Sequence, residues 1–235
     1  MEKPNKITMI TAGNENCYVL SNENTTILVD TCSKKARELV WERIKDLPIK
    51  LIILTHGHYD HIENAKYFAD KFDAKIAMSQ LDAELISSPL KNELKAKNFS
   101  GKVMLANYKR HVKKNKIDEF EIDIPLYDGF DLNEYGFDAK IISLSGHTKG
   151  SVAIISASKM AIVGDTLMNM PTPTTALIAE DFETCEKDVD RLRELSLESI
   201  YTGHGKKFNG RIWLTKENEL ATADSKRIDG DAKQD

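Results

Sequence analysis

Cysteine is scarce in this chain of 235 residues, and its few thiols show no pairing pattern. Cys17, Cys32 and Cys185 are odd in number and far apart, and no C-x-x-C pair occurs. We therefore predict reduced, mostly structural thiols, as is usual in a cytoplasmic protein. A disulfide between Cys17 and Cys32 is the less favoured alternative.

Long apolar runs are also lacking. No stretch approaches the roughly 20 apolar residues that a membrane-spanning helix needs. The first apolar run, residues 7–10, follows a polar start and is interrupted by Thr8, which does not fit a secretory signal. We therefore expect a protein that does not span a membrane and that stays in the cytoplasm.

No large excess of either charge is present. The net charge is −4, and 30% of the residues are charged while 41% are hydrophobic. This balance is typical of an ordinary globular protein and does not favour binding to nucleic acid. The length fits a single domain over residues 1–235, with a polar tail at 229–235 that we expect to fray. No heptad stripe indicates an oligomeric state.

One segment concentrates positive charge. Residues 91–116 contain nine lysines and arginines and one acid, a net charge of +8, so the rest of the chain carries −12. The surrounding stretch, residues 80–116, predicts helical pieces broken near Pro89. This basic insert is either a solvated helical face or a cover over the active site that attracts an anionic substrate. His111, which lies within it, is interpreted as a surface or lid residue rather than a metal ligand.

Hydrophobic periodicity predicts strands mixed with helices, which belongs to a layered α/β architecture. Strands are predicted at residues 17–20, 26–30, 51–54, 75–78, 119–124, 137–142, 152–155, 160–163 and 199–201, and helices at 36–47, 65–72, 182–195 and 215–228. The first two strands read as a hairpin. Asp30 ends that hairpin, and we interpret it as a turn cap in preference to a side chain that points toward the active site.

Half of the histidines lie in one short loop. The stretch Thr55-His56-Gly57-His58-Tyr59-Asp60-His61 directly follows the predicted strand at residues 51–54. Neutral imidazole is the commonest metal ligand, and carboxylate is its usual companion at zinc or iron. A buried strand that presents such a loop at its end suits a metal site, and a solvated, His-rich turn is the weaker alternative.

Three more candidates sit at predicted strand ends beside glycine. They are His147 in Gly146-His147-Thr148, Asp165 after Gly164, and His204 between two glycines. Together with the loop they make seven nitrogen and oxygen ligands, which are too many for one tetrahedral ion. They suit two ions that share a carboxylate and hold a hydroxide between them. Such a site performs hydrolysis.

These motifs, in this order, resemble the metallo-β-lactamase-fold superfamily, whose signature is T-H-x-H-x-D-H followed by separate G-H-T, G-D and G-H-G elements. The resemblance covers roughly residues 7–210 and implies a four-layer αββα sandwich of two mixed sheets with helices outside. It implies a first metal on His56, His58 and His147, a second on Asp60, His61 and His204, and Asp165 bridging both. Asp60 would also be catalytic, because it could orient the attacking water or accept its proton.

Differences between this sequence and known branches of the superfamily narrow the choice of branch. Zinc β-lactamases with a three-histidine first site usually carry cysteine at the position of Asp165. Flavodiiron oxidoreductases commonly carry an acid at the position of His58, and a flavodoxin domain follows. Glyoxalase II proper adds a C-terminal helical domain, whereas this sequence stops about thirty residues after His204. The pattern is most similar to the glyoxalase II-like, lactonase-like and generic hydrolase branches.

The sequence thus predicts a dinuclear metal-dependent hydrolase that uses a metal-bridging hydroxide. Its expected substrate is a small ester, thioester, lactone or phosphodiester, anionic if the basic segment binds it. The expected cofactors are two divalent ions, zinc first, with iron or manganese as alternatives. An iron-dependent oxidoreductase similar to persulfide dioxygenases and a non-catalytic metal-binding protein are the competing hypotheses. No substrate-binding residue can be assigned.

Overall fold

The computed structural model describes residues 6–23 and 25–211, so the predicted helix at 215–228 and the tail at 229–235 lie outside the described residues. The strands are β1 (Lys6–Ala12), β2 (Glu15–Ser21), β3 (Thr26–Val29), β4 (Ile49–Ile53), β5 (Lys75–Met78), β6 (Lys95–Ala96), β7 (Ile124–Pro125), β8 (Ala139–Ser143), β9 (Val152–Ser156), β10 (Met160–Ile162), β11 (Leu167–Asn169), β12 (Pro173–Thr175), β13 (Ile178–Ala179), β14 (Ser199–Tyr201) and β15 (Phe208–Asn209). The α-helices are α1 (Arg37–Ile44), α2 (Tyr59–Ile62), α3 (Ala65–Phe72), α4 (Ala83–Ser87), α5 (Phe99–Lys114) and α6 (Phe182–Glu194).

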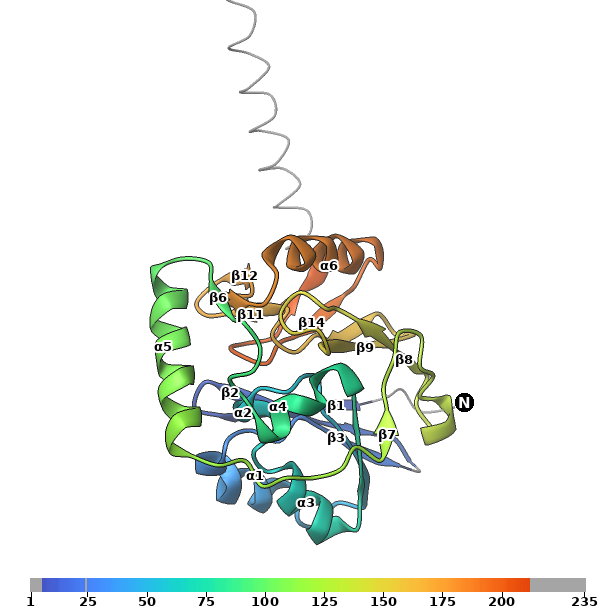
Figure 1. Ribbon diagram of the computed structural model, residues 1–235. Coiled ribbons are helices and arrows are strands. Elements are labelled where there is room, and N and C mark those ends of the chain that lie inside the picture. The colour runs from blue at the N-terminus through green and yellow to red at the C-terminus, as the bar shows by residue number, and fades with distance from the viewer. Residues whose placement is uncertain (1–5, 24, 212–235) are drawn as a thin grey trace, which may run out of the picture.

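Two mixed sheets form the centre of the fold (Figure 1). The first has six strands in the order β1-β2-β3-β4-β5-β7, and the second has five in the order β15-β14-β10-β9-β8. In the first sheet, β1, β2 and β3 are antiparallel neighbours, whereas β3, β4, β5 and β7 run parallel. The antiparallel pairing of β2 with β3 confirms the predicted hairpin.

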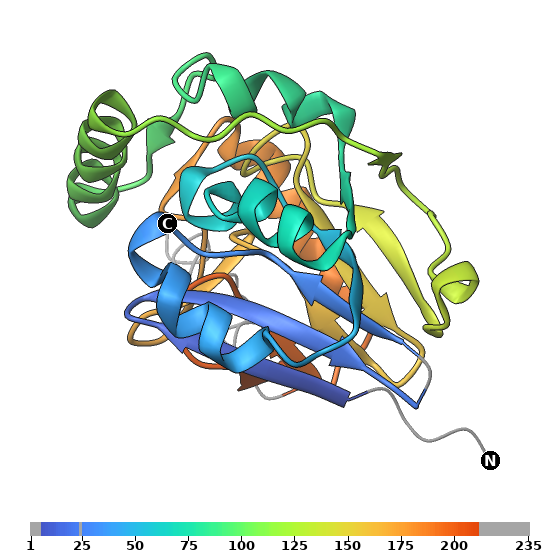
Figure 2. The same ribbon diagram turned by 90° about the horizontal axis from the view of Figure 1, so that it is seen from below.

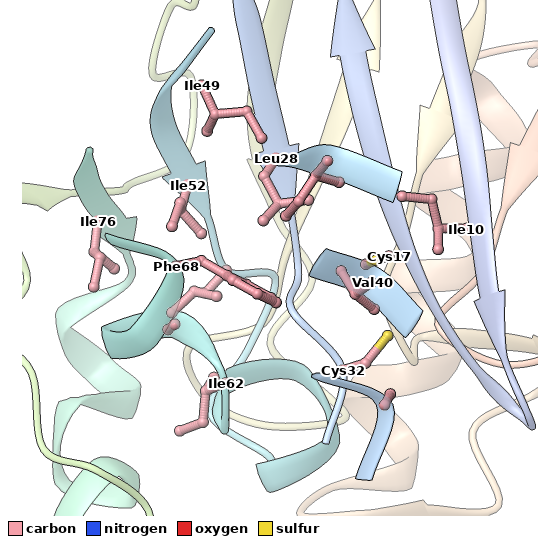
Figure 3. Close-up of a cluster of buried hydrophobic side chains, with 14 of the residues drawn as sticks. Ile10, Cys17, Leu28, Cys32, Val40, Ile49, Ile52, Ile62, Phe68 and Ile76 are labelled. Atoms are coloured by element: carbon pink, nitrogen blue, oxygen red, sulfur yellow. The ribbon is translucent and has the colours of Figure 1, made fainter. Parts of the chain in front are cut away.

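Helices cover the outer faces of both sheets. One buried cluster joins the first sheet to α1 and α3, and includes Leu28, Val40 and Phe68 (Figure 3). A second cluster, including Tyr18 and Ile154, lies between the two sheets, and a third packs α6 onto the second sheet. These three apolar layers give the αββα sandwich that the resemblance implied.

The side chains of β2 alternate between two apolar clusters, one on each face of the first sheet. Cys17 and Val19 belong to the cluster under α1 and α3, whereas Tyr18 and Leu20 belong to the cluster between the sheets. Successive residues of a strand point to opposite faces, so a strand in the middle of this sandwich must be apolar on both. That requirement produces the nearly continuous apolar runs in the sequence.

Two local predictions were wrong. Of the predicted strand at 119–124, only Ile124 lies in a strand, β7, and Asp123 adds one backbone bond to the Ile76 carbonyl. Phe120 and Ile122 do pack against the core. Alternation reports which side chains are buried, but a ladder also needs a partner strand, and here the Asp123 side chain accepts the Ile76 N–H instead. Residues 90–94, expected to be helical, form a loop before β6.

The basic segment forms a long helix that stands at the side of the sandwich. Helix α5 lies apart from α1, α3 and α6 in both views (Figures 1 and 2). Its basic residues Lys102, Lys109, Arg110, Lys113 and Lys114 are all exposed, so its positive charge is solvated. Within the described part of the chain, no helix is both long and apolar enough to cross a bilayer.

Candidate metal centre

All seven predicted ligands meet at one edge of the two sheets. His56 follows β4 and His58 directly precedes α2. Asp60 and His61 lie within α2, which is a single turn long. The other three come from the loops after β8, β10 and β14, and these residues are His147, Asp165 and His204. Strand ends that open at the same edge therefore bring together residues up to 148 positions apart (His56 to His204).

The first group consists of three buried imidazoles. His147 Nε2 lies 3.2 Å from His56 Nε2 and 3.0 Å from His58 Nδ1. Each of the three rings offers a nitrogen, and these atoms lie within 4.8 Å of one another. Three imidazole nitrogens converging in this way could hold one metal ion.

The second group combines Asp60, His61 and His204, and Asp165 lies between the two groups. His204 Nε2 is 3.2 Å from Asp60 Oδ2 and 3.2 Å from Asp165 Oδ2. Asp165 also approaches His61 Nε2 at 3.4 Å and His147 Nε2 at 3.8 Å. Its carboxylate therefore touches members of both groups.

Contacts behind the rings determine which nitrogen faces the centre. The Nδ1 atoms of His147 and His204 lie 2.8 Å and 2.7 Å from the carbonyl oxygens of Ile178 and Asn14. A carbonyl only accepts, so Nδ1 carries the proton and donates, which leaves the Nε2 lone pair directed at the centre. This orientation of imidazoles by a second layer of acceptors is usual behind metal-binding histidines.

Asp30 orients two imidazole rings, those of His61 and His56. Its Oδ2 lies 2.8 Å from His61 Nδ1 and accepts a hydrogen bond of 2.9 Å from Thr55 Oγ1. Because that hydroxyl donates to Asp30, it can accept from His56 Nδ1, which is 3.1 Å away. The interpretation of Asp30 as a turn cap was therefore wrong: a fully buried carboxylate beneath the site is held there by tertiary contacts that local turn chemistry does not reveal.

The electrostatics of the two groups differ. Burial, followed by the charges of neighbouring imidazoles, lowers the pKa of His56 and His58 well below 6.5, and burial also lowers the pKa of His147. These rings are therefore neutral and can donate lone pairs. Burial opposes protonation of His61 too, but Asp30 and Asp165 outweigh it and raise its pKa well above 6.5.

The carboxylates of the centre are held ionised. Burial alone would raise the pKa of Asp60, but the hydrogen bond from His204 and the charges of His61 and His204 lower it to about 2. Burial likewise opposes ionisation of Asp165, yet His204 and His61 lower its pKa well below 3.8. A buried pair of ionised carboxylates needs positive charge nearby, which divalent cations supply.

Unpaired atoms in the cluster fit a metal as well. Among the described residues, His61 Nε2 and Asp165 Oδ1 are buried in the cluster without a hydrogen-bond partner. Buried polar atoms are nearly always paired, so such a concentration of exceptions calls for a missing partner. The nitrogen and carboxylate donors suit zinc, iron or manganese, and cysteine takes no part in the cluster.

Asp82, which the sequence analysis did not single out, links the two loops that carry the histidines of the first group. Its Oδ2 accepts from Gly57 N at 2.8 Å and from Thr148 Oγ1 at 2.6 Å, and its Oδ1 accepts from Gly150 N at 2.7 Å. Gly57 lies between His56 and His58, and Thr148 follows His147, so one carboxylate positions the loops of all three histidines. Its only sequence signal is an acid shortly after the end of β5.

A cavity of about 370 Å³ opens beside the centre, and His58, Asp60, Asp165 and His204 reach it. The facing wall is α5, with Val103, Met104, Asn107 and Tyr108 in the lining. The volume is within the range of small-molecule sites. Substrate could therefore reach the cluster through a space bounded by the basic segment.

His111 connects α5 to the residues around the candidate metal centre, but it is not one of the seven candidate ligands. Its Nε2 lies 2.6 Å from Glu63 Oε1, and its ring stacks on Tyr59 at 3.8 Å. Glu63 is buried and also accepts the Lys34 N–H. His111 is in neither candidate metal group, and its contacts with Glu63 and Tyr59 anchor α5.

The three thiols are free and buried. This agrees with the prediction of reduced, structural cysteines.

Two curated proteins are similar to this chain over most of its length. A probable metallo-hydrolase of Streptococcus pyogenes serotype M6 is 29% identical over 198 residues, which covers 81% of this chain and 79% of the relative. The hydroxyacylglutathione hydrolase GloC of Haemophilus influenzae is 28% identical over 207 residues, covering 85% and 90%.

Among solved structures, that of TTHA1623 in a di-iron-bound form has the same fold. It superimposes with a TM-score of 0.62 at 20% identity and covers 87% of this chain and 94% of that chain. The sequence profile of the metallo-beta-lactamase superfamily matches residues 10–204, a span that contains all seven residues of the cluster. The chain belongs to the metallo-beta-lactamase superfamily.

Proposed function

We propose that this protein is a dinuclear metal-dependent hydrolase of small esters, thioesters, lactones or phosphodiesters. The observation that carries the proposal is Asp165, whose carboxylate approaches His147 on one side and both His61 and His204 on the other. A carboxylate shared between two donor groups would suit a pair of divalent ions. The similarity to two proteins named as hydrolases supports the same reaction class.

Each residue has a proposed task. His56, His58 and His147 would hold one ion, Asp60, His61 and His204 the other, and Asp165 both. Two divalent ions, zinc in our proposal, would supply a water-derived nucleophile at neutral pH and polarise the carbonyl or phosphoryl oxygen of the substrate.

Other residues of the protein would orient the attacking water, hold the imidazoles and exclude bulk water. Asp60 lines the cavity, and its ionised carboxylate can accept a hydrogen bond from the attacking water and orient it. Asp30 keeps His56 and His61 in the tautomer that directs Nε2 inward. Helix α5, the basic insert predicted at residues 80–116, covers one side of the cavity and would shield the reacting groups from bulk water.

A hydrolysis screen with and without metal tests this function. The protein is stripped with a chelator, reloaded with zinc, manganese or ferrous iron, and assayed on esters, thioesters, lactones and phosphodiesters. We expect turnover only after reloading, and a loss of about 100-fold or more in kcat for Asp60→Asn. Asp70→Asn, a change of the same kind at an exposed site in α3, should behave like the unchanged protein. Turnover that survives complete metal removal would contradict the proposal.

Iron-dependent oxidation is the second candidate, because imidazole and carboxylate also suit iron and TTHA1623 was solved in a di-iron-bound form. Oxygen consumption by the iron-loaded protein with a persulfide substrate distinguishes it from hydrolysis. Metal binding without turnover in either assay would favour the non-catalytic hypothesis.

A further inference from the structure

The cavity beside the candidate metal centre has walls that suit an uncharged, apolar group. Val103 and Met104 of α5 line it together with Met170 and Ile178, and Tyr59 and Tyr108 add aromatic surface. The polar side chains between them, such as Ser100 and Asn107, are neutral. Burying apolar surface against such walls is favourable by about 25 cal/mol per Å².

The lysines and arginines of α5 stay outside this lining. Of the described residues that line the cavity, none is lysine or arginine, although α5 carries five of them. They lie on the exposed side of the helix, and Arg110 donates from Nη1 to Asn107 Oδ1 at 2.9 Å. The expectation that the basic segment attracts an anionic substrate therefore finds no cation where the substrate would bind.

Negative charge, by contrast, is built into the cavity. Glu15 lines it beside Asp60, and its two oxygens already accept hydrogen bonds from Ser33, one from the backbone N–H at 2.8 Å and one from Oγ at 2.9 Å. An ionised carboxylate in the lining repels an anion that enters the cavity. An anionic group on the α5 side of the cavity, away from the candidate metal ligands, would also lose its hydration without a lysine or arginine as its partner.

We propose that the cavity binds an uncharged, apolar acyl chain, so that the substrate is a neutral acyl ester or thioester. This inference rests on the proposed hydrolase function. In the reaction, the oxygen of water bonds to the acyl carbon, the carbon–sulfur or carbon–oxygen bond breaks, and the thiol or alcohol leaves with a proton while the acyl group departs as a carboxylic acid.

A matched substrate pair tests the charge of the acyl chain. Pentanoyl and succinyl thioesters of N-acetylcysteamine have the same uncharged leaving group and acyl chains of similar length, but only the succinyl chain ends in a carboxylate. We expect the zinc-loaded protein to hydrolyse the pentanoyl thioester with a kcat/KM about 10-fold or more above that for the succinyl thioester. Equal rates, or a preference for succinyl, would overturn this inference while leaving the hydrolase function intact.

Variants locate the preference in the cavity wall. Met104→Lys places a cation among the apolar side chains and should reduce the pentanoyl preference about 10-fold. Lys109→Ala removes an exposed cation from the same helix and should leave the ratio of the two rates unchanged. A ratio that responds to Lys109→Ala but not to Met104→Lys would assign recognition to the exposed face and contradict the inference.

A binding measurement separates this inference from the hydrolase function. Pentanamide and succinamate are tested as ligands of the full-length protein by ligand-observed NMR, which needs no turnover. Binding of pentanamide but not of succinamate, lost in Met104→Lys, supports the inference even if neither thioester is hydrolysed. Binding of succinamate alone, or of neither compound, would overturn it.

Discussion

His61 Nδ1 lies 2.8 Å from Asp30 Oδ2, and both side chains are almost completely buried. The same carboxylate accepts hydrogen bonds from the backbone N–H and the hydroxyl of Thr55. One acid beneath the centre therefore fixes the orientation of His61 directly and that of His56 through Thr55. Removing its ability to accept these bonds should disturb both candidate metal groups together.

Asp30→Asn tests that relationship. Whichever way the amide is turned, its NH₂ faces a donor, either the Thr55 N–H or the Thr55 hydroxyl and His61. We expect metal affinity to fall about 10- to 100-fold and the free energy of unfolding to drop by about 1–3 kcal/mol. Equilibrium dialysis with zinc and urea unfolding measure the two effects. Asp46→Asn, an exposed change in the α1–β4 loop, is the control, and equal zinc affinity in both variants would refute the role of Asp30.

Asp82→Asn should loosen the loops of the first metal group. Both oxygens of Asp82 accept from N–H groups, of Gly57 and Gly150, so an amide must set a donor against a donor. We expect a loss of about 2–3 kcal/mol in unfolding free energy and about tenfold weaker metal binding. Glu84→Gln changes an exposed acid in α4, whose ion pair with Lys91 is solvated, and should have almost no effect. Wild-type behaviour of Asp82→Asn would show that the loops keep their positions without it.

His111→Ala tests the anchor of α5. The variant loses the contact with Glu63 Oε1 at 2.6 Å and the stacking on Tyr59. Amide hydrogen exchange along α5 should accelerate about tenfold or more, and KM should rise, while the metal content stays the same. Lys109→Ala is exposed on the same helix and supplies the comparison. Unchanged exchange in α5 would show that other contacts hold the cavity wall.

The buried carboxylate of Asp188, which accepts the N–H of Gly146 just before His147, predicts a pH dependence of stability. Burial, only partly offset by the Gly146 N–H, raises its pKa from 3.8 to about 6. The folded protein therefore binds this proton more tightly than the unfolded chain does. Its contribution to stability is complete below pH 3.8 and is lost as the pH rises through about 6.

The variant Asp188→Asn isolates that contribution. Between pH 4 and pH 7 the wild-type protein should lose about 2 kcal/mol of unfolding free energy relative to Asp188→Asn. Asp190→Asn, exposed on the same helix, should track the wild-type protein across this range. Urea unfolding at several pH values gives the comparison, and parallel curves for wild type and Asp188→Asn would show that the Asp188 pKa is not raised.

The ligands were predictable because their signal is local. His56, His147 and His204 each follow a predicted strand and stand beside glycine, so the sequence indicates that each lies at a strand end. The resemblance to the superfamily is what implied that they share one site. Asp30 and Asp82 carry no comparable signal, because their function depends on backbone groups that are distant in the chain. The strand predicted at 119–124 failed for a related reason: periodicity shows burial, but a hydrogen-bonding partner is a tertiary property.

The residues that line the cavity could not be predicted from the sequence either. The basic segment was visible as a run of lysines, but which face of α5 turns inward follows from packing of Tyr108 and from the His111 contact. That packing places Val103 and Met104 toward the centre and leaves the lysines in solvent.

Metal content is the most direct test of the central claim that two ions share Asp165. Elemental analysis of the protein purified without added metal, and again after zinc loading, is compared with the same measurements on Asp165→Ala. We predict about two divalent ions per chain in the loaded wild-type protein and one or fewer in the variant. No bound metal in the wild-type protein even after loading, or the same content in both proteins, would contradict the account.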